Sequence, residues 1–334
     1  MFMSKKITMK SAYGKIGLVL ILLFMSLLSL RFGSAEMTNA EFFGGLFKSS
    51  DFETERIILL SLRLPRILAA IIAGAGLSVS GVLLQSVTGN ELASPNIIGV
   101  NAGAGFFMVL MLFFAPHAVY LRPFAAFIGA FLTTLVILSA ASKGQLSKTT
   151  VILCGVAITA VLNAGISFLT YLNPDILMDY NFFSVGGVAG TEADELILPA
   201  IAVAFCVLLS LVLSKKIDIL CLGDSLANSL GVNVKTFRIV CLAVAGLSAA
   251  SAVSFAGLLG FVGLVVPHIA RKITDGSVSE MLKVSVLTGG ILVVTADLMG
   301  RIIFAPSEIP VGVVMAFVGA PFLLYIVIRR SKNA

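Results

Sequence analysis

Residues 67–87 read ILAAIIAGAGLSVSGVLLQSV, an apolar run that contains no charged residue. A helix of about 20 mostly apolar residues crosses the roughly 30 Å of hydrocarbon in a bilayer, where lipid offers the backbone no hydrogen-bond partner. The run is apolar on all sides, whereas a helix on the surface of a soluble protein carries one polar face. This stretch therefore predicts a transmembrane helix.

The rest of the chain repeats this pattern. Its 334 residues are 58% hydrophobic and 12% charged, with a mean hydropathy of +1.07, far above the roughly half-apolar usage of soluble domains. Nine further apolar segments occur at 16–30, 97–114, 124–141, 151–172, 196–213, 237–253, 258–269, 281–304 and 311–328. We predict an all-α integral membrane protein of about ten transmembrane helices, in a single domain over residues 1–334.

Two of these segments are ambiguous. The first follows Lys5, Lys6, Lys10 and Lys15 and resembles a signal peptide that ends near residues 33–35, but we favour an uncleaved first helix. The eighth segment is too short for a full crossing and is rich in glycine. It either packs steeply against its neighbours or crosses partially, shielded by protein.

The distribution of lysine and arginine indicates the orientation, because cytoplasmic loops carry an excess of both residues. With ten crossings and the N-terminus inside, 16 of the 23 Lys and Arg residues lie on the cytoplasmic side. The others are Arg31, Lys48, Arg56, Arg63, Arg66, Arg122 and Arg301. We therefore predict cytoplasmic N- and C-termini, an external loop at about 173–195 and a cytoplasmic loop at about 214–236.

The cytoplasmic loop is predicted to contain a short amphipathic helix. Asp224 can cap a helix that ends at Gly231, and Leu222, Leu226 and Leu230 recur every four residues on one face. Such a helix outside the bilayer core lies on lipid or enters the groove of a partner protein. We favour the partner because the helix has no basic face and few aromatic residues.

Two stretches of the sequence resemble each other. Residues 75–78 and 245–248 both read AGLS, and each is followed at a similar separation by Pro-x-Ile, at 95–97 and 267–269. Five crossings separate the copies, so they run in opposite directions, as in the inverted repeats of transporters. We predict an inverted repeat that relates helices 2–5 to helices 7–10. Chance similarity between helices rich in small residues is the alternative.

The chain carries no recognisable catalytic motif. It has two histidines and no HExxH or GxSxG motif, so we predict that it is not an enzyme and needs no cofactor. Four cysteines, at positions 154, 206, 221 and 241, lack the spacing of metal ligands, and we expect small buried residues and no metal site. The net charge is +6, but the charged residues lie between the apolar segments and form no basic stripe with aromatic residues. This pattern argues against nucleic-acid binding.

The motifs that the sequence lacks narrow the possible energy sources for transport. No GxxxxGK[ST] phosphate loop occurs, so any ATP that drives transport is bound by a partner. Asp297 is the only acidic residue at membrane depth, and it precedes Arg301 by four residues. This spacing favours a helical ion pair over a proton relay. An ion-coupled secondary transporter remains the alternative class.

Several motifs are distributed over nearly the whole chain from the second helix onward. They read RLPR at 63–66, NELASP at 90–95, GV at 99–100, the loop 223–232, GLLGFVGLVVPHIAR at 257–271, EIPVG at 308–312 and GAP at 319–321. Together they resemble the permeases of ATP-binding-cassette (ABC) importers for iron-siderophore complexes, haem and vitamin B12. The resemblance implies a homodimer or heterodimer of ten-helix permease subunits in the lipid of a bacterial cell membrane. It also implies two cytoplasmic ATPase subunits and an external substrate-binding protein.

The resemblance assigns roles to particular residues. The residues implied to dock on the ATPase are Leu222, Gly223, Leu226, Ala227, Leu230 and Gly231. Those implied to form the cytoplasmic gate are Asn90, Leu92, Lys148 and Thr149, although Lys148 departs from the small hydroxyl residue expected there. Those implied to receive acidic residues of the binding protein are Arg63, Arg66 and Arg301. The implied function is passage of a ferric siderophore complex, with haem or cobalamin as alternatives.

Overall fold

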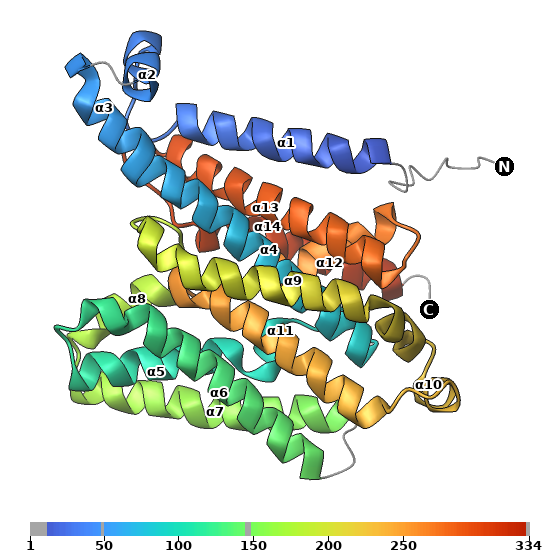
Figure 1. Ribbon diagram of the computed structural model, residues 1–334. Coiled ribbons are helices and arrows are strands. Elements are labelled where there is room, and N and C mark those ends of the chain that lie inside the picture. The colour runs from blue at the N-terminus through green and yellow to red at the C-terminus, as the bar shows by residue number, and fades with distance from the viewer. Residues whose placement is uncertain (1–11, 48–49, 144–147, 332–334) are drawn as a thin grey trace.

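The computed structural model describes residues 12–47, 50–143 and 148–331, and the regular structure in these residues is helical (Figure 1). Within them, each of the ten predicted segments corresponds to one helix. These helices are α1 (Ala12–Arg31), α4 (Leu64–Thr88), α5 (Val100–Phe114), α6 (Arg122–Lys143), α7 (Lys148–Leu172), α9 (Ala193–Cys221), α11 (Val234–Ala256), α12 (Val262–Ile273), α13 (Val278–Ile302) and α14 (Val311–Ser331). Seven of the described helices are long and apolar enough to cross a membrane, and α5 and α14 are shorter apolar helices. The predicted all-α membrane fold is confirmed.

Helix α4 lies at the centre of the molecule and is buried along almost its whole length. It packs against α13, α11, α9 and α12. Small residues permit this close approach. A side chain at Gly74 or Gly289 would collide with the backbone of the facing helix, and Gly81 meets Gly263 of α12 in the same way. The density of glycine and alanine in residues 67–87 therefore serves close helix packing.

The packing pattern agrees with the predicted inverted repeat. Helix α4 packs on α13, and α11, its counterpart in the second half, packs on α6, the counterpart of α13. The two central helices meet directly where the Ser248 hydroxyl donates to the Gly76 carbonyl oxygen at 2.8 Å. Each half also contains a short helix in second place, α5 in the first and α12 in the second.

Helix α12 is too short to cross a membrane fully. Its 12 residues span about 18 Å at 1.5 Å per residue, less than the hydrocarbon thickness. The irregular segment before it is covered by protein, because Leu258 N–H donates to the Phe183 carbonyl oxygen at 3.1 Å and Gly187 N–H donates to the Ala256 carbonyl oxygen at 2.9 Å. Of the two alternatives for this segment, these contacts favour the shielded partial crossing, which stays a prediction.

The structure adds short helices that the sequence analysis did not predict. Helix α2 (Asn39–Leu46) begins with a capping box between Thr38 and Glu41, and α8 (Ile176–Val185) lies in the predicted external loop. Helix α3 (Glu53–Ile57) continues through a π-helical turn (Ile58–Arg63) directly into α4. The second crossing is thus longer than predicted, because its charged first turns resemble a loop in the sequence.

The ends of the helix bundle carry different elements. Helix α1 begins and α14 ends where α10 (Asp224–Ser229) lies, and we call this the α10 end (Figure 1). Helices α2, α3 and α8 lie at the opposite end, which we call the α8 end. Helix α9 continues through Lys215 and Lys216 to Cys221, so the connection that contains α10 runs over residues 222–233. The cytoplasmic location of the termini stays a prediction.

Candidate functional site

Helix α7 exposes polar and small side chains at membrane depth. Asn163 and Ser167, in the middle of the helix, are exposed together with Ala157, Ala160 and Ala164, and we call these five residues the α7 face. Polar side chains in membrane helices face other protein or a water-filled cavity, because lipid cannot satisfy their hydrogen bonds. The α7 face is therefore unsuited to lipid. The sequence analysis missed it, although an asparagine inside segment 151–172 is a usable signal.

Helix α9 differs from α7 in the side chains that it exposes. Its exposed residues between 197 and 212 are all apolar: Ile197, Leu198, Ile201, Ala204, Phe205, Leu208 and Val212. Its Ser210 is buried and donates to the Cys206 carbonyl oxygen at 2.6 Å. This surface suits lipid chains.

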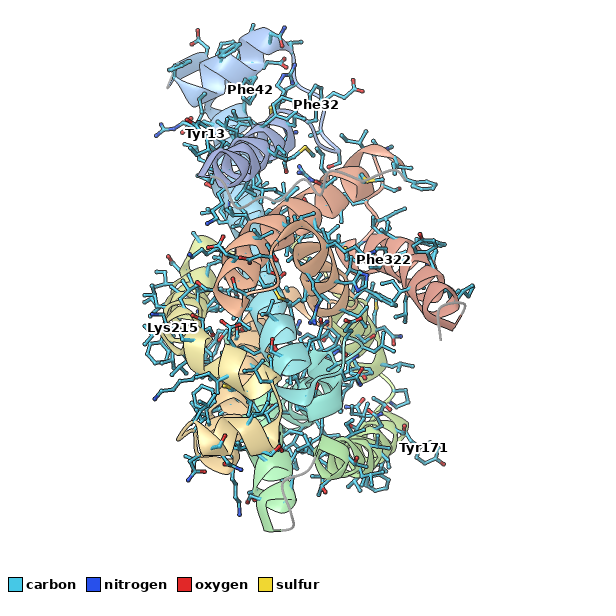
Figure 2. All side chains as sticks on the ribbon, turned by 90° about the vertical axis from the view of Figure 1, so that its right-hand side faces the viewer. Tyr13, Phe32, Phe42, Tyr171, Lys215 and Phe322 are labelled. Carbon is cyan, nitrogen blue, oxygen red and sulfur yellow. The ribbon has the colours of Figure 1, made fainter. Side chains whose placement is uncertain are left out.

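Helix α14 lies on the same side of the molecule as α7. Figure 2 views the bundle along its helices from the α10 end, with Tyr171 of α7 and Phe322 of α14 on one side and Lys215 of α9 on the other. Helix α14 exposes the small residues Ala316 and Ala320. Both helices also expose large apolar side chains, among them Val161 and Phe168 of α7 and Phe317 and Leu324 of α14. One side of the bundle thus carries two helices that mix small or polar exposed residues with apolar ones, whereas the exposed residues of α9 from 197 to 212 are all apolar.

At the α10 end, the predicted apolar face of the loop is exposed. Leu222, Leu226 and Leu230 are 62%, 55% and 60% exposed, whereas Ala227 is fully buried and anchors the loop. The flanking Gly223 and Gly231 both have positive φ, +114° and +81°, a conformation that glycine adopts without steric cost. The loop therefore presents three leucines outward on a fixed backbone.

The predicted capping role of Asp224 is wrong. The residue at the helix N-cap is Gly223, with no side-chain cap, and Asp224 occupies the first turn. Its carboxylate accepts hydrogen bonds at 2.8 and 3.0 Å from the buried guanidinium of Arg238 on α11. A buried charge needs a partner, and the pairing fixes α10 to α11 at the same time.

The residues of the predicted gate lie at the α10 end. Asn90 follows α4 and forms a turn in which its side-chain oxygen accepts from Leu92 N–H at 3.0 Å, and Leu92 is 37% exposed. Thr149 is exposed in the first turn of α7, which begins at Lys148. The Lys148 side chain lies outside the described part of the structure. The gate stays a prediction.

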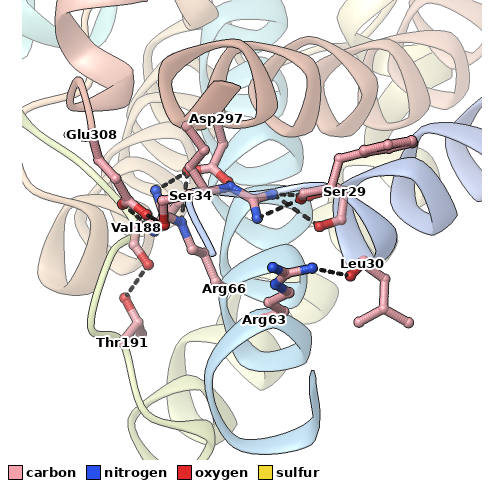
Figure 3. A network of polar contacts seen from close by, with 11 residues as sticks. Ser29, Leu30, Ser34, Arg63, Arg66, Val188, Thr191, Asp297 and Glu308 are labelled. Atoms are coloured by element: carbon pink, nitrogen blue, oxygen red, sulfur yellow. Dashed lines mark hydrogen bonds and ion pairs between the residues drawn. The ribbon is translucent and has the colours of Figure 1, made fainter. Parts of the chain in front are cut away.

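At the α8 end, three arginines from two helices meet in a polar cluster (Figure 3). Arg66 of α4 donates from Nε to Asp297 at 2.8 Å and pairs with Glu308 at 2.6 Å. Arg301 pairs with Asp297 from the other side, with Nε at 2.9 Å from a carboxylate oxygen. Asp297 is 1% exposed, so its charge is neutralised inside the protein by two guanidinium groups. The predicted ion pair with Arg301 is confirmed, and Arg66 is a partner that the sequence spacing did not reveal.

The same cluster holds the C-terminal end of α1. Arg63, 5% exposed, donates to the carbonyl oxygens of Leu30, Arg31 and Ala35 at 2.6–2.9 Å. Arg301 donates to the carbonyl oxygen of Phe32 at 3.1 Å and also to Ser29. The guanidinium groups of Arg63 and Arg301 are therefore buried and hydrogen-bonded within the chain. The Arg66 side chain is the more exposed, at 13%. Docking of a binding protein on these arginines stays a prediction.

Glu308 completes the cluster from the loop between α13 and α14. Burial raises the pKa of this carboxyl, but hydrogen bonds from Ser34 and Arg66 and the charges of Arg66 and Arg301 outweigh burial. The pKa of Glu308 therefore lies below its ordinary value of 4.5. A cavity of about 860 Å³ opens beside the cluster and is bordered by Arg63, Arg66, Arg301, Glu308 and Thr191.

Comparison with known proteins agrees with this geometry. A model of the FecCD transport family matches residues 20–329. The Fe(3+)-citrate import system permease protein YfmE of Bacillus subtilis (strain 168) is 36% identical over 325 residues, which cover 95% of each chain. YfmD, a permease protein of the Fe(3+)-citrate import system of the same strain, is 37% identical over 283 residues, 85% of this chain and 84% of its own.

Two further relatives extend the comparison. The heme-iron transport system permease protein IsdF of Staphylococcus aureus (strain Newman) is 33% identical over 316 residues, with 95% of each chain covered. A solved structure of a metal-chelate type ABC transporter in an inward-facing conformation superposes with a TM-score of 0.85 at 27% identity. The match covers 96% of this chain and 100% of the other.

Proposed function

The chain belongs to the FecCD transport family, and from that premise we propose that it is the permease subunit of an ABC importer for a ferric siderophore complex. The family is one of transport proteins, so the chain is a transporter subunit rather than an enzyme. Relatives named for Fe(3+)-citrate support a chelate of ferric iron with a small organic acid. Haem is the second candidate, because IsdF is named for heme-iron transport.

The α7 face is the observation that carries this proposal. Its asparagine and serine at membrane depth need water or protein beside them, and α14 adds small exposed residues on the same side of the bundle. Two permease subunits that place these sides opposite each other would enclose a passage whose wall includes polar and small residues. The second subunit is either a copy of this chain or a related permease. YfmE and YfmD, two permeases named for one kind of import system in one strain, favour a related permease.

The ATPase is proposed to dock at the α10 end, which makes that end cytoplasmic. Leu222, Leu226 and Leu230 form an exposed apolar face at the end of the bundle, where a soluble partner can cover it. Ala227, Gly223 and Gly231 fix the backbone that presents this face. Asn90, Leu92, Lys148 and Thr149 lie at the same end, where a cytoplasmic gate is expected.

The binding protein is proposed to dock at the α8 end. Arg66 is the cluster's most exposed guanidinium and borders the open cavity, so an acidic side chain of the partner can reach it most easily. An arginine suits this contact because its guanidinium forms bidentate bonds with a carboxylate. In this proposal Arg63 and Arg301 position the surface by holding the C-terminal end of α1 and the residues after it.

An ion-coupled secondary transporter is disfavoured by the surroundings of Asp297. A proton relay needs a carboxyl group that can gain and lose a proton during the cycle. Asp297 is held instead between the guanidinium groups of Arg66 and Arg301, the geometry of a buried structural ion pair.

The passage can be tested by thiol labelling at the α7 face. In a variant without the four native cysteines, Asn163→Cys in the assembled importer should react with a water-soluble, membrane-impermeant thiol reagent, because a thiolate forms only where water is present. Leu208→Cys, exposed on the apolar face of α9, is the matched control. We expect labelling at position 163 to be at least about tenfold faster. Equal rates at positions 163 and 208 would refute the assignment of the α7 face to a passage.

A further inference from the structure

An apolar cavity of about 760 Å³ lies between α6, α9 and α11, away from the α7 face. Phe124 and Phe127 of α6 and Leu198, Ile201 and Phe205 of α9 form its walls, and Leu247, Ser251 and Ser254 of α11 line it from the third side. All lining residues of α9 belong to its first turns, and those of α6 do as well. The cavity therefore occupies the half of the membrane nearest the α8 end.

The helices around the cavity expose apolar surfaces that suit lipid. The exposed residues of α9 from 197 to 212 are apolar, and α6 exposes Phe124, Ile128, Leu132 and Leu135 while it buries Thr133 and Thr134. Ser251 and Ser254 donate to carbonyl oxygens within α11 at 2.8 Å each. Their hydroxyl donors are therefore already used and add little polarity to the cavity wall. An open apolar cavity at this depth suits a lipid chain, since empty space forfeits dispersion contacts.

The mouth of the cavity is acidic. Glu192, Asp194 and Glu195 precede or begin α9 and are exposed, and all three border the cavity together with Tyr120. No lysine or arginine lines this cavity among the described residues. Glu192 and Asp194 also border the 860 Å³ cavity beside Arg63, Arg66 and Arg301, and Glu195 borders a cavity with Arg66 and Arg122. These arginines already have partners within the chain: Arg66, Arg122 and Arg301 pair with carboxylates, and Arg63 donates to carbonyl oxygens. The mouth thus presents negative charge at the level of the lipid head groups.

We propose that this cavity binds a phospholipid with an ammonium head group, in the leaflet at the α8 end. One acyl chain lies between the phenylalanines of α6 and the first turns of α9, and the ammonium group lies among the three carboxylates. Charge complementarity selects an amine-bearing lipid over an anionic one, whose head group the carboxylates repel. This proposal concerns the lipid-facing side of the bundle and does not depend on the transported substrate.

The absence of tryptophan from the chain allows a direct test. Phe205→Trp, in the full chain reconstituted in liposomes, places a single fluorescent reporter in the cavity wall. Phosphatidylethanolamine or phosphatidylglycerol with brominated acyl chains is added at increasing mole fraction, and quenching reports which lipid occupies the cavity. Leu208→Trp, on the same helix but outside the cavity lining, measures ordinary surrounding lipid and shows that the reconstituted protein is intact.

At position 205 we expect brominated phosphatidylethanolamine to bind about fivefold more strongly than brominated phosphatidylglycerol, the effect of a weak ion pair. At position 208 the two lipids should quench equally. Glu192→Gln with Glu195→Gln should reduce the preference at position 205 to less than about twofold. Glu53→Gln with Glu55→Gln, an equal charge change on α3 at the same end, should leave it unchanged.

Two results would overturn the proposal. Equal quenching by both lipids at position 205 would show that the carboxylates select no head group. Absence of quenching at position 205, with normal quenching at position 208, would show that protein rather than lipid covers the cavity.

Discussion

At the scale of single residues, the buried charges determine how the α8 end is built. Asp297 lies between Arg66 and Arg301, and Arg63 has only carbonyl oxygens as described hydrogen-bond partners. The sequence predicts the Asp297–Arg301 pair because four residues separate partners on one helix face. It cannot predict the contact between Arg66 and Asp297, because 231 positions separate them and only the packing of α4 on α13 brings them together.

Loss of the central carboxylate should destabilise the protein strongly. Asp297→Asn leaves two buried guanidinium groups without their common counter-charge, which costs about 3–5 kcal/mol. Denaturant unfolding in detergent measures the change. Glu280→Gln is the control, because Glu280 pairs with the partly exposed Lys15 and Lys283, and such pairs contribute about 0–1 kcal/mol. If both variants lost the same small stability, the polar cluster would not hold the α8 end together.

The pH dependence of stability should depend on Glu308. Its folded-state pKa is lowered, so its contribution is fully present above the ordinary pKa of 4.5 and is lost as pH falls through the folded value. The stability difference between the wild type and Glu308→Gln should be constant from about pH 8 to pH 5 and decrease only below that range. A difference that disappears between pH 7 and pH 6 would contradict the ion pair with Arg66.

At the scale of secondary-structure elements, apolar length predicts the membrane helices well and their extensions poorly. Residues 67–87 fall inside a longer apolar helix that begins at Glu53. The predicted segment is shorter because the sequence pattern places Arg63 and Arg66 in water. The structure places both side chains in a protein-lined polar cluster instead. Helix α8 was missed because no long apolar run marks it, and α10 was predicted because its leucines recur at helical spacing.

The exposed leucines of α10 should be required for assembly with the ATPase. Leu226→Asp or Leu230→Asp would bury an unpaired charge in the contact, at a cost of several kcal/mol, and should abolish co-purification of the ATPase. Asn228→Asp is the matched control, since it adds the same charge to an exposed position off the leucine face. Undiminished co-purification with Leu226→Asp would place the ATPase contact elsewhere.

At the scale of the whole molecule, the two halves of the chain form one bundle around α4 and α11. The short AGLS match predicts the inverted repeat, and the reciprocal packing of α4 on α13 and α11 on α6 agrees with it. The passage could not be predicted in the same way. A polar residue such as Asn163 appears in the sequence as one interruption of an apolar run, and only the packed structure shows that it points out of the bundle.

The central claim is that this bundle is half of a passage driven by a separate ATPase. The most direct measurement is uptake of radioactive ferric citrate into proteoliposomes that contain this chain, its partner permease and the ATPase, with the binding protein and ATP supplied. We predict uptake that requires ATP and stops when the ATPase is omitted, because the chain has no phosphate loop of its own. Uptake of the same chelate by the permease alone, driven by a proton gradient without ATPase, would contradict the account.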